Sequence, residues 1–425
     1  MSSLHPFFSA PAFDSAKVRH WRANNEALLQ QISHGVIQRE LDGALPIEAV
    51  ASLRAAKVGA LRLPEDRGGA GFSLPELTQI WIDLASVDNN LAQALRGHYA
   101  LVEDRLWQHQ RGADQSWWFD RFAHGEIAGN AWSEAGATAI DTQRTRLSPD
   151  GKGGYRINGT KFYTTGSIFA QWADVYALRQ RPGHADDFVI ALVDTREPGV
   201  AVIDDWDGFG QRGTGSGSTH FDDVPVPAEN VLVFTERFPY QTALYQVNLL
   251  ATLVGVGHAA VRETVAAVQA RDRNYSHANA DRVRDDPQIL ARIGDIAASV
   301  YAAEAAVIRN AEALQRVSDA ANASPTEIQA LNEAGEIESS LAQVVVTELI
   351  LKATTDLFDT LGASATSRTK GLDRHWRNAR TLSSHNPRVL KAKVVGDHLV
   401  NDAPPPYAWA IGVTPHSGAR GQNQH

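Results

Sequence analysis

Fifteen histidines are the side chains of this chain best suited to proton transfer or metal binding near neutral pH. None of them lies in a His-Glu-x-x-His pattern, and none forms a compact cluster with carboxylates along the sequence. Paired ligands at such spacings are typical of zinc sites, so we predict no metal site. Single histidines can still serve proton transfer in a redox or group-transfer reaction.

A glycine-rich run, Gly213-Thr-Gly-Ser-Gly-Ser218, could in principle cradle a phosphate. A dinucleotide-binding glycine motif must follow a strand and open a helix within a βαβ unit. The flanking sequence shows no such pattern. We therefore predict that this chain does not bind NADH.

Sulphur is nearly absent from the sequence, because Met1 is the only methionine and there is no cysteine. A soluble chain of this length ordinarily carries on the order of ten sulphur-containing residues. Core packing does not disfavour either residue. Expression under sulphur limitation is one explanation, resistance to oxidation is a compatible second, and compositional drift is a third. Without cysteine there are neither disulfides nor thiolate metal sites.

The charge balance excludes a polyanion binder, since 49 acidic residues outnumber 40 basic ones and give a net charge of -9. The first residues lack a basic segment followed by an apolar run. No stretch reaches the roughly 18 apolar residues of a membrane span. We expect a cytoplasmic protein that binds neither nucleic acid nor membrane.

The periodicity divides the chain into three segments. Apolar residues at spacings of three and four predict helices over about 15–122, as in Ile47, Val50 and Leu53. Alternation with a period near two predicts an antiparallel sheet or barrel over about 129–233. Long helices follow Pro239, including one that begins near Pro287, and they suit a bundle. The polar stretch 366–387 is expected to be irregular and to suit a site.

Three segments of the sequence resemble the acyl-CoA dehydrogenase superfamily: Leu63-Pro-Glu-Asp-Arg-Gly-Gly-Ala-Gly-Phe72, Ile157-Asn-Gly-Thr-Lys-Phe-Tyr-Thr-Thr-Gly166 and Thr219-His-Phe-Asp-Asp-Val-Pro-Val-Pro227. The resemblance extends over about 15–403. It implies an α+β fold with an N-terminal helical domain (1–125), a central β-barrel domain (126–236) and a C-terminal four-helix bundle with a short tail (237–425).

Within the superfamily, three further segments resemble the flavin-dependent monooxygenase branch exemplified by dibenzothiophene monooxygenases. They are Gly129-Asn-Ala-Trp-Ser-Glu134, Ile203-Asp-Asp-Trp-Asp-Gly-Phe-Gly-Gln-Arg212 and Gly371-Leu-Asp-Arg-His-Trp-Arg-Asn-Ala-Arg-Thr381. Dehydrogenases of this superfamily typically carry a glutamate base where this chain has Asn386. An amide cannot abstract a proton from carbon. Because some dehydrogenases place the base elsewhere, acyl-CoA oxidation remains an alternative.

The resemblance implies His98, His385 and Thr164 as catalytic residues. His385 would hydrogen-bond oxygen bound to the flavin, His98 would hold substrate or shuttle a proton, and the Thr164 hydroxyl would lie near the reactive edge. A histidine in a helix can equally be a structural residue. The branch also carries a second histidine where this chain has Leu382, which makes the pocket more apolar or leaves one histidine to act alone.

The resemblance also implies a cofactor site for FMN, with FAD the less favoured flavin. Trp206 could instead be a packing residue, and Arg282 a solvated loop charge. In this family such an arginine reaches the flavin of a neighbouring subunit, which implies a homotetramer. The expected cofactor-binding residues are Asn130, Ser133, Phe162, Thr164, Trp206 and Arg282.

The implied reaction uses FMNH2 from a separate NAD(P)H-dependent flavin reductase and O2, through a C4a-hydroperoxyflavin. The scarcity of sulphur favours a small organosulphur substrate and a role in sulphur acquisition. Three alternatives remain: an FAD-dependent acyl-CoA dehydrogenase, a monooxygenase acting on an aromatic or amine substrate, and a non-catalytic protein of the same fold.

Overall fold

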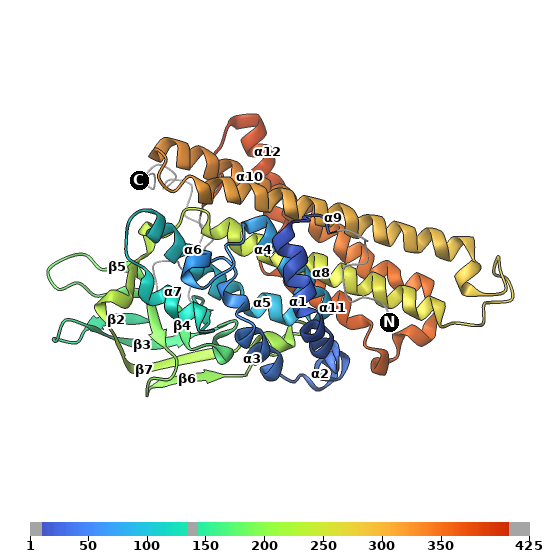
Figure 1. Ribbon diagram of the computed structural model, residues 1–425, viewed down its shortest axis with the longest axis horizontal. Coiled ribbons are helices and arrows are strands. Elements are labelled where there is room, and N and C mark those ends of the chain that lie inside the picture. The colour runs from blue at the N-terminus through green and yellow to red at the C-terminus, as the bar shows by residue number, and fades with distance from the viewer. Residues whose placement is uncertain (1–10, 135–142, 408–425) are drawn as a thin grey trace, which may run out of the picture.

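A computed structural model describes residues 11–134 and 143–407 and contains the three predicted segments in the predicted order. Figure 1 shows a β-sheet at one end of the molecule, short helices beside it, and long helices that run away from it. The predicted α+β fold, with helical regions on either side of a β domain, is confirmed.

The N-terminal region is helical, and its helices end at residue 123. The second half of this region is almost fully buried, because α4 lies between the other short helices and the long helix α8. Ser73 caps α4 in a capping box with Glu76. The helices are α1 (Ala16–Ser33), α2 (Val36–Asp42), α3 (Ile47–Ala55), α4 (Leu74–Val87), α5 (Asn89–Ala94), α6 (Arg96–Gln110) and α7 (Ser116–Ala123).

The glycine-rich turn before α4 brings two stretches of backbone into close contact. A Cβ atom on Gly69 would lie 2.1 Å from the carbonyl oxygen of Leu63, so no other residue fits there. The turn directs the chain into α4, which packs against the centre of the bundle.

The central region forms one sheet in the order β6-β7-β3-β2-β4-β5-β8, with β1 paired to β4. Within the described residues the ladder ends at β6 and β8 and is not closed by hydrogen bonds, unlike the barrel we expected. The antiparallel prediction is also only partly right, because β1 and β2 both run parallel to β4. The strands are β1 (Ala128–Ala131), β2 (Arg146–Pro149), β3 (Tyr155–Lys161), β4 (Trp172–Arg179), β5 (Asp187–Asp194), β6 (Val200–Ile203), β7 (Ser218–Val226) and β8 (Val231–Val233).

The C-terminal region is built on three long helices. The helix predicted near Pro287 begins at that residue, and the Asp286 side chain accepts a hydrogen bond from the Gln288 backbone N–H as its N-cap. Buried residues of α4, α8 and α9 share one apolar core, which holds the N-terminal helices and the bundle together. The helices are α8 (Gln241–Gln269), α9 (Pro287–Asp319), α10 (Pro325–Asp356), α11 (Asp373–Ser384) and α12 (Val389–Asn401).

The stretch 366–387 is more regular than its polar sequence suggested, because it contains α11. One face of α11 is buried and includes His375, Asn378, Ala379 and Leu382. Their spacing of three and four residues is helical, and their polar members concealed the amphipathic pattern. The prediction of an irregular segment was wrong.

Helix α8 is long and apolar enough to cross a membrane, with a mean hydropathy of 1.4 over its most apolar window. We did not anticipate a segment of this kind. Of that window, 94% is buried inside the fold. Its apolar character is therefore explained by packing, since α8 contacts α4, α9, α10 and α11.

Candidate functional site

His385 lies just beyond α11 and meets Arg96, the first residue of α6. The guanidinium Nη2 of Arg96 is 3.2 Å from Nε2 of His385. Arginine can only donate, so Nε2 accepts and the neutral ring carries its proton on Nδ1. Desolvation by the surrounding protein and then the Arg96 charge lower the pKa of His385, although the residue retains exposed surface. The arrangement provides a neutral histidine that also hydrogen-bonds the side chain of Asn386.

Asn130, on β1, lies against the same turn of α6. Its backbone N–H donates to the carbonyl of Thr165 at 3.2 Å. A Cβ on Gly97 would lie 2.8 Å from the Asn130 nitrogen, so the glycine after Arg96 permits this approach. The Asn130 side-chain oxygen is buried and has no hydrogen-bond partner among the described residues. Such an atom is available to a ligand.

Asn386 stands where dehydrogenases of the superfamily typically carry a glutamate, and hydrogen bonds of its side chain and backbone hold it in place. Its Nδ2 donates to Oε1 of Gln246 at 2.7 Å, and its backbone carbonyl accepts from Nε2 of Gln343 at 3.0 Å. This position therefore has no carboxylate and no group able to act as a base.

Ser133, Phe162 and Trp206 lie on connected segments at the edge of the sheet. The backbone N–H of Phe162 donates to the Ser133 carbonyl at 2.9 Å. The ring of Trp206 meets that of Tyr163 edge to face, with centroids 5.8 Å apart. Its indole N–H donates to the Gly210 carbonyl at 3.1 Å. These residues offer a hydroxyl and aromatic surfaces close to the segment that carries Asn130.

Thr164 is buried, and its hydroxyl makes two hydrogen bonds within the protein. The hydroxyl donates to the Gly217 carbonyl at 3.0 Å and accepts from the Thr219 hydroxyl at 2.8 Å. The glycine-rich run 213–218 therefore serves the β6–β7 connection. The geometry argues against the predicted catalytic and flavin-contacting role of the Thr164 side chain.

His98 also has both ring nitrogens committed, to backbone groups. The Ala128 backbone N–H donates to Nδ1 at 3.3 Å, and Nε2 lies 2.9 Å from the Gly59 carbonyl, which fixes the proton on Nε2. The side chain is fully buried, and burial lowers the pKa of His98 to about 4. A role in substrate binding or proton transfer is not supported by this geometry. The two bonds tie α6 to Gly59 and to β1.

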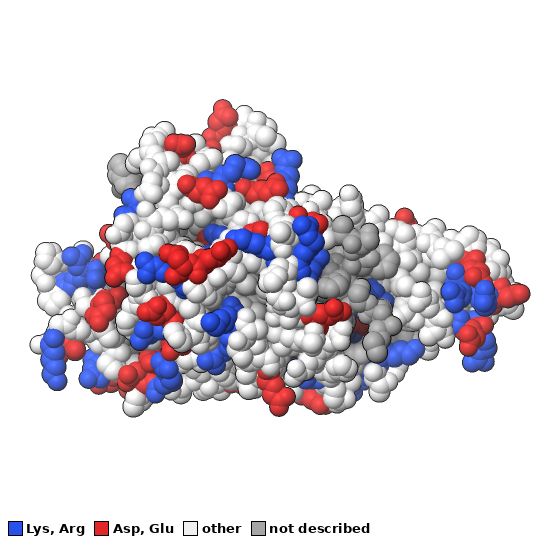
Figure 2. Space-filling model, viewed as in Figure 1, with Lys and Arg blue, Asp and Glu red and all other residues white. Residues whose placement is uncertain are grey.

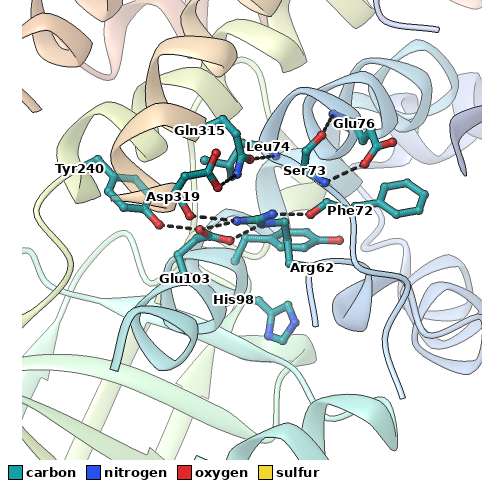
Figure 3. Close-up of polar contacts among 12 residues, drawn as sticks. Arg62, Phe72, Ser73, Leu74, Glu76, His98, Glu103, Tyr240, Gln315 and Asp319 are labelled. Atoms are coloured by element: carbon teal, nitrogen blue, oxygen red, sulfur yellow. Dashed lines mark hydrogen bonds and ion pairs between the residues drawn. The ribbon is translucent and has the colours of Figure 1, made fainter. Parts of the chain in front are cut away.

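Figure 3 shows His98 beneath an interior ion pair without any polar contact to it. The pair joins Nε of Arg62 to Oε1 of Glu103 at 2.5 Å, and the Tyr240 hydroxyl donates to Oε2 of Glu103 at 2.7 Å. All three side chains are buried. Since Glu103 lies on α6 and Tyr240 caps α8, this cluster fixes α6 and thereby Arg96.

Arg282 lies apart from the other predicted residues. It is in the α8–α9 connection, which Figure 1 places at the opposite end of the molecule from the sheet. It is exposed and pairs with Asp285 at 2.7 Å. Figure 2 shows acidic and basic side chains crowded together at that end. Within one chain, Arg282 cannot join the site; contact with a second subunit remains a prediction.

Two site residues were not predicted, Arg96 and Tyr245. The Arg96 guanidinium carbon lies 4.9 Å from the centre of the Tyr245 ring, on α8. The sequence did contain a signal for Arg96, an arginine in a helix that is otherwise buried, because a buried arginine without a partner is rare.

No group of three or more histidine or acidic side chains suited to a metal occurs in 11–134 or 143–407.

Sequence profiles for the acyl-CoA dehydrogenase middle domain and C-terminal domain match residues 130–224 and 249–387. Dibenzothiophene monooxygenase of Rhodococcus erythropolis is 27% identical over 387 residues, covering 86% of this chain and 89% of its own length. The probable FMNH2-dependent monooxygenase SfnC of Pseudomonas putida is 26% identical, covering 89% and 94%.

Two solved structures superpose over most of the chain. TdsC from Paenibacillus sp. A11-2, in complex with FMN and indole, gives a TM-score of 0.82 at 26% identity, covering 93% of this chain and 99% of that one. Methanesulfinate monooxygenase MsuC from Pseudomonas fluorescens gives 0.80 at 25%, with the same coverage. With both domain profiles matched in order and the whole fold shared, this chain belongs to the acyl-CoA dehydrogenase-like family.

Proposed function

We propose that this protein is a flavin-dependent monooxygenase that uses FMNH2 and O2 to oxidise an organosulphur compound. One oxygen atom goes to the substrate, the other leaves as water, and FMNH2 is oxidised to FMN. The observation that carries the proposal is the pair His385–Asn386: a neutral histidine held by Arg96, next to an amide where a dehydrogenase would need a base.

The described residues suit a flavin. The buried Asn130 oxygen lacks a partner in the described part of the chain, Ser133 contributes a hydroxyl, and Phe162 and Trp206 contribute aromatic surface. A bound reduced flavin would supply the electrons for activating oxygen. SfnC is named as FMNH2-dependent, and TdsC was solved with FMN, which supports FMN over FAD.

His385 would act as the proton-holding group. Arg96 fixes the proton on Nδ1, so the ring can donate one hydrogen bond without carrying a charge. Arg96 itself is fixed by the packing of α6 against β1 and α8. The chain thus positions one donor at a partly buried contact between α6 and the segment after α11.

An organosulphur substrate is supported by two independent observations. The chain contains no cysteine and one methionine, which suits a protein made when sulphur is scarce. Dibenzothiophene monooxygenase and methanesulfinate monooxygenase are both named for sulphur compounds. TdsC was also solved with indole, so hydroxylation of an aromatic compound is the second candidate.

The proposal also includes a partner protein, an oligomeric state and a location in the cell. A chain without a recognisable nicotinamide site needs reduced flavin from elsewhere, so we include a separate NAD(P)H-dependent flavin reductase. A homotetramer would bring Arg282 to a neighbouring flavin, and we place the enzyme in the cytoplasm.

The test supplies photoreduced FMN to the purified protein, adds oxygenated buffer with a panel of sulphides, sulphinates and sulphonates, and identifies products by mass spectrometry under 18O2. One 18O atom per product molecule, with product formed about 100-fold more slowly by His385→Ala, is the expected result. The His184→Gln variant is the control, because His184 is an exposed loop residue.

The same preparation distinguishes the competing functions. Bleaching of bound FAD by acyl-CoA under anaerobic conditions would show a dehydrogenase. Labelled oxygen in indole, with none in any sulphur compound, would show an aromatic hydroxylase. Peroxide as the sole oxygen product over the whole panel would contradict the proposed function.

A further inference from the structure

Arg96 is the one buried arginine without a carboxylate partner in the described part of the chain. The other five are each paired with at least one aspartate or glutamate. Beyond the described residues, the sequence contains one further carboxylate side chain, that of Asp141. The buried arginines are Arg22, Arg62, Arg96, Arg105, Arg237 and Arg374.

The partners that Arg96 does have leave its charge uncompensated. Only 5% of the residue is exposed. Its Nη2 donates to the neutral ring of His385, its face lies over Tyr245, and its Nε has no hydrogen-bond partner within 11–134 and 143–407. Burial of an unpaired charge is costly. A site that keeps an unpaired buried positive charge is suited to bind an anionic group of a ligand.

The neighbouring groups extend this donor set. The Tyr245 hydroxyl is buried and has no partner among the described residues. The neutral ring of His385 carries its N–H donor on Nδ1, because Nε2 accepts from Arg96, and it also hydrogen-bonds the Asn386 side chain. His385 also has exposed surface, so its contact with Arg96 is only partly buried.

We propose that Arg96 anchors a negatively charged acid group of the substrate, of the sulphinate or sulphonate type. This inference rests on the proposed monooxygenase function. A guanidinium presents paired N–H donors that match two oxygens on one acid group. Anchoring that group at Arg96 would place the substrate beside the ring of His385.

The first test compares two ligands of nearly equal shape, methanesulphonate and neutral dimethyl sulphone, by calorimetric titration of the FMN-loaded wild-type protein. Charge-assisted hydrogen bonds contribute about 1.5–3 kcal/mol, so the anion should bind about 10- to 100-fold tighter. Equal affinities would overturn the proposal. This comparison requires no variant.

The second test asks which residue gives the preference. In Arg96→Met the preference should fall to less than about 3-fold, and Arg96→Lys should retain part of it, because lysine keeps the charge but loses the paired donors. Arg262→Met is the matched control, because Arg262 lies outside the proposed site and donates to the Ser86 carbonyl. An unchanged preference in Arg96→Met would overturn the proposal.

Separate readouts keep the outcomes distinct. If Arg96→Met weakens binding of FMN itself but not the preference for the anion, Arg96 serves the flavin and the proposal is wrong. If the wild type shows the preference but oxygenates no sulphur compound, the proposed function fails while the anion site stands. Methanesulphinate, supplied with photoreduced FMN, is the turnover probe.

Discussion

Arg96 at the start of α6 donates to Nε2 of His385 just after α11, and this contact joins two segments that lie 289 residues apart in the chain. The contact determines which nitrogen of His385 holds the proton and keeps the ring neutral. It also binds together the N-terminal helices, which carry Arg96, and the C-terminal helices, which carry His385.

Because His385 is neutral, we expect the rate of substrate oxygenation to show no histidine titration between pH 5.5 and pH 8. Surrounding protein and the Arg96 charge lower the pKa of His385, so the ring stays deprotonated throughout. His385→Ala should lower the rate of substrate oxygenation by about 100-fold, the usual contribution of one positioned proton donor.

The measurement is a pH profile of oxygenation with saturating photoreduced FMN, for the wild type and His385→Gln. An inflection near pH 6.5 in the wild type that disappears in His385→Gln would contradict the lowered pKa. Peroxide release rather than substrate oxidation in the variant separates loss of proton control from loss of flavin binding.

His98 predicts a loss of stability in mild acid. Its pKa is lowered to about 4 by burial, whereas an unfolded histidine titrates near 6.5. Below pH 6.5 the unfolded state therefore binds a proton that the folded state does not, so stability is present above that pH and falls toward pH 4. Between pH 7.5 and 5.0 the loss is about 2 kcal/mol at most.

Urea unfolding at both pH values measures this loss. The wild type should lose more stability on acidification than His98→Gln, because the variant has no imidazole to protonate. Exposed His184→Gln should behave as the wild type. Equal losses in wild type and His98→Gln would contradict the assignment of His98 as a buried neutral residue.

The fold was predictable where local chemistry decides it. Asp286 followed by Pro287 gives a cap and a first helical residue, and α9 begins there. The parallel pairing of β1 with β4 was not predictable, because alternation within a strand carries no information on its partner. Helix α11 was missed since polar residues such as His375 and Asn378 occupy its buried face.

The site was predictable in part, because a sequence shows residue types but not which atoms are already bonded. His385 and His98 were chosen for the same reason, yet His385 meets polar side chains whereas His98 has two backbone partners. Arg96 was overlooked because its importance depends on the absence of a carboxylate, which only the packing reveals.

Asn130 and Thr164 predict opposite results when flavin binding and stability are compared. Asn130→Ala removes a buried oxygen that has no partner among the residues that the structure describes, so it should weaken FMN binding about 5- to 10-fold with little loss of stability. Thr164→Val removes a hydroxyl bonded to Gly217 and Thr219. It should cost about 1–3 kcal/mol of folding stability and leave FMN affinity unchanged.

Fluorescence titration of FMN and urea unfolding of each variant provide the two readouts, and Thr164→Ser, which keeps the hydroxyl, is the control. A large loss of FMN affinity in Thr164→Val with normal stability would restore the threonine to the cofactor site.

Arg282 gives the last prediction, on assembly. Its ion pair with Asp285 is exposed at both partners, so Arg282→Ala should leave thermal stability unchanged. If the guanidinium reaches a flavin in a second subunit, the same substitution should weaken FMN binding about 10-fold or more, the contribution of a charge-assisted hydrogen bond. Arg284→Ala is the matched control, an exposed arginine two residues away. FMN titration beside sedimentation velocity tests this, because equal FMN affinity in the two variants, with the oligomer intact, would remove Arg282 from the cofactor site.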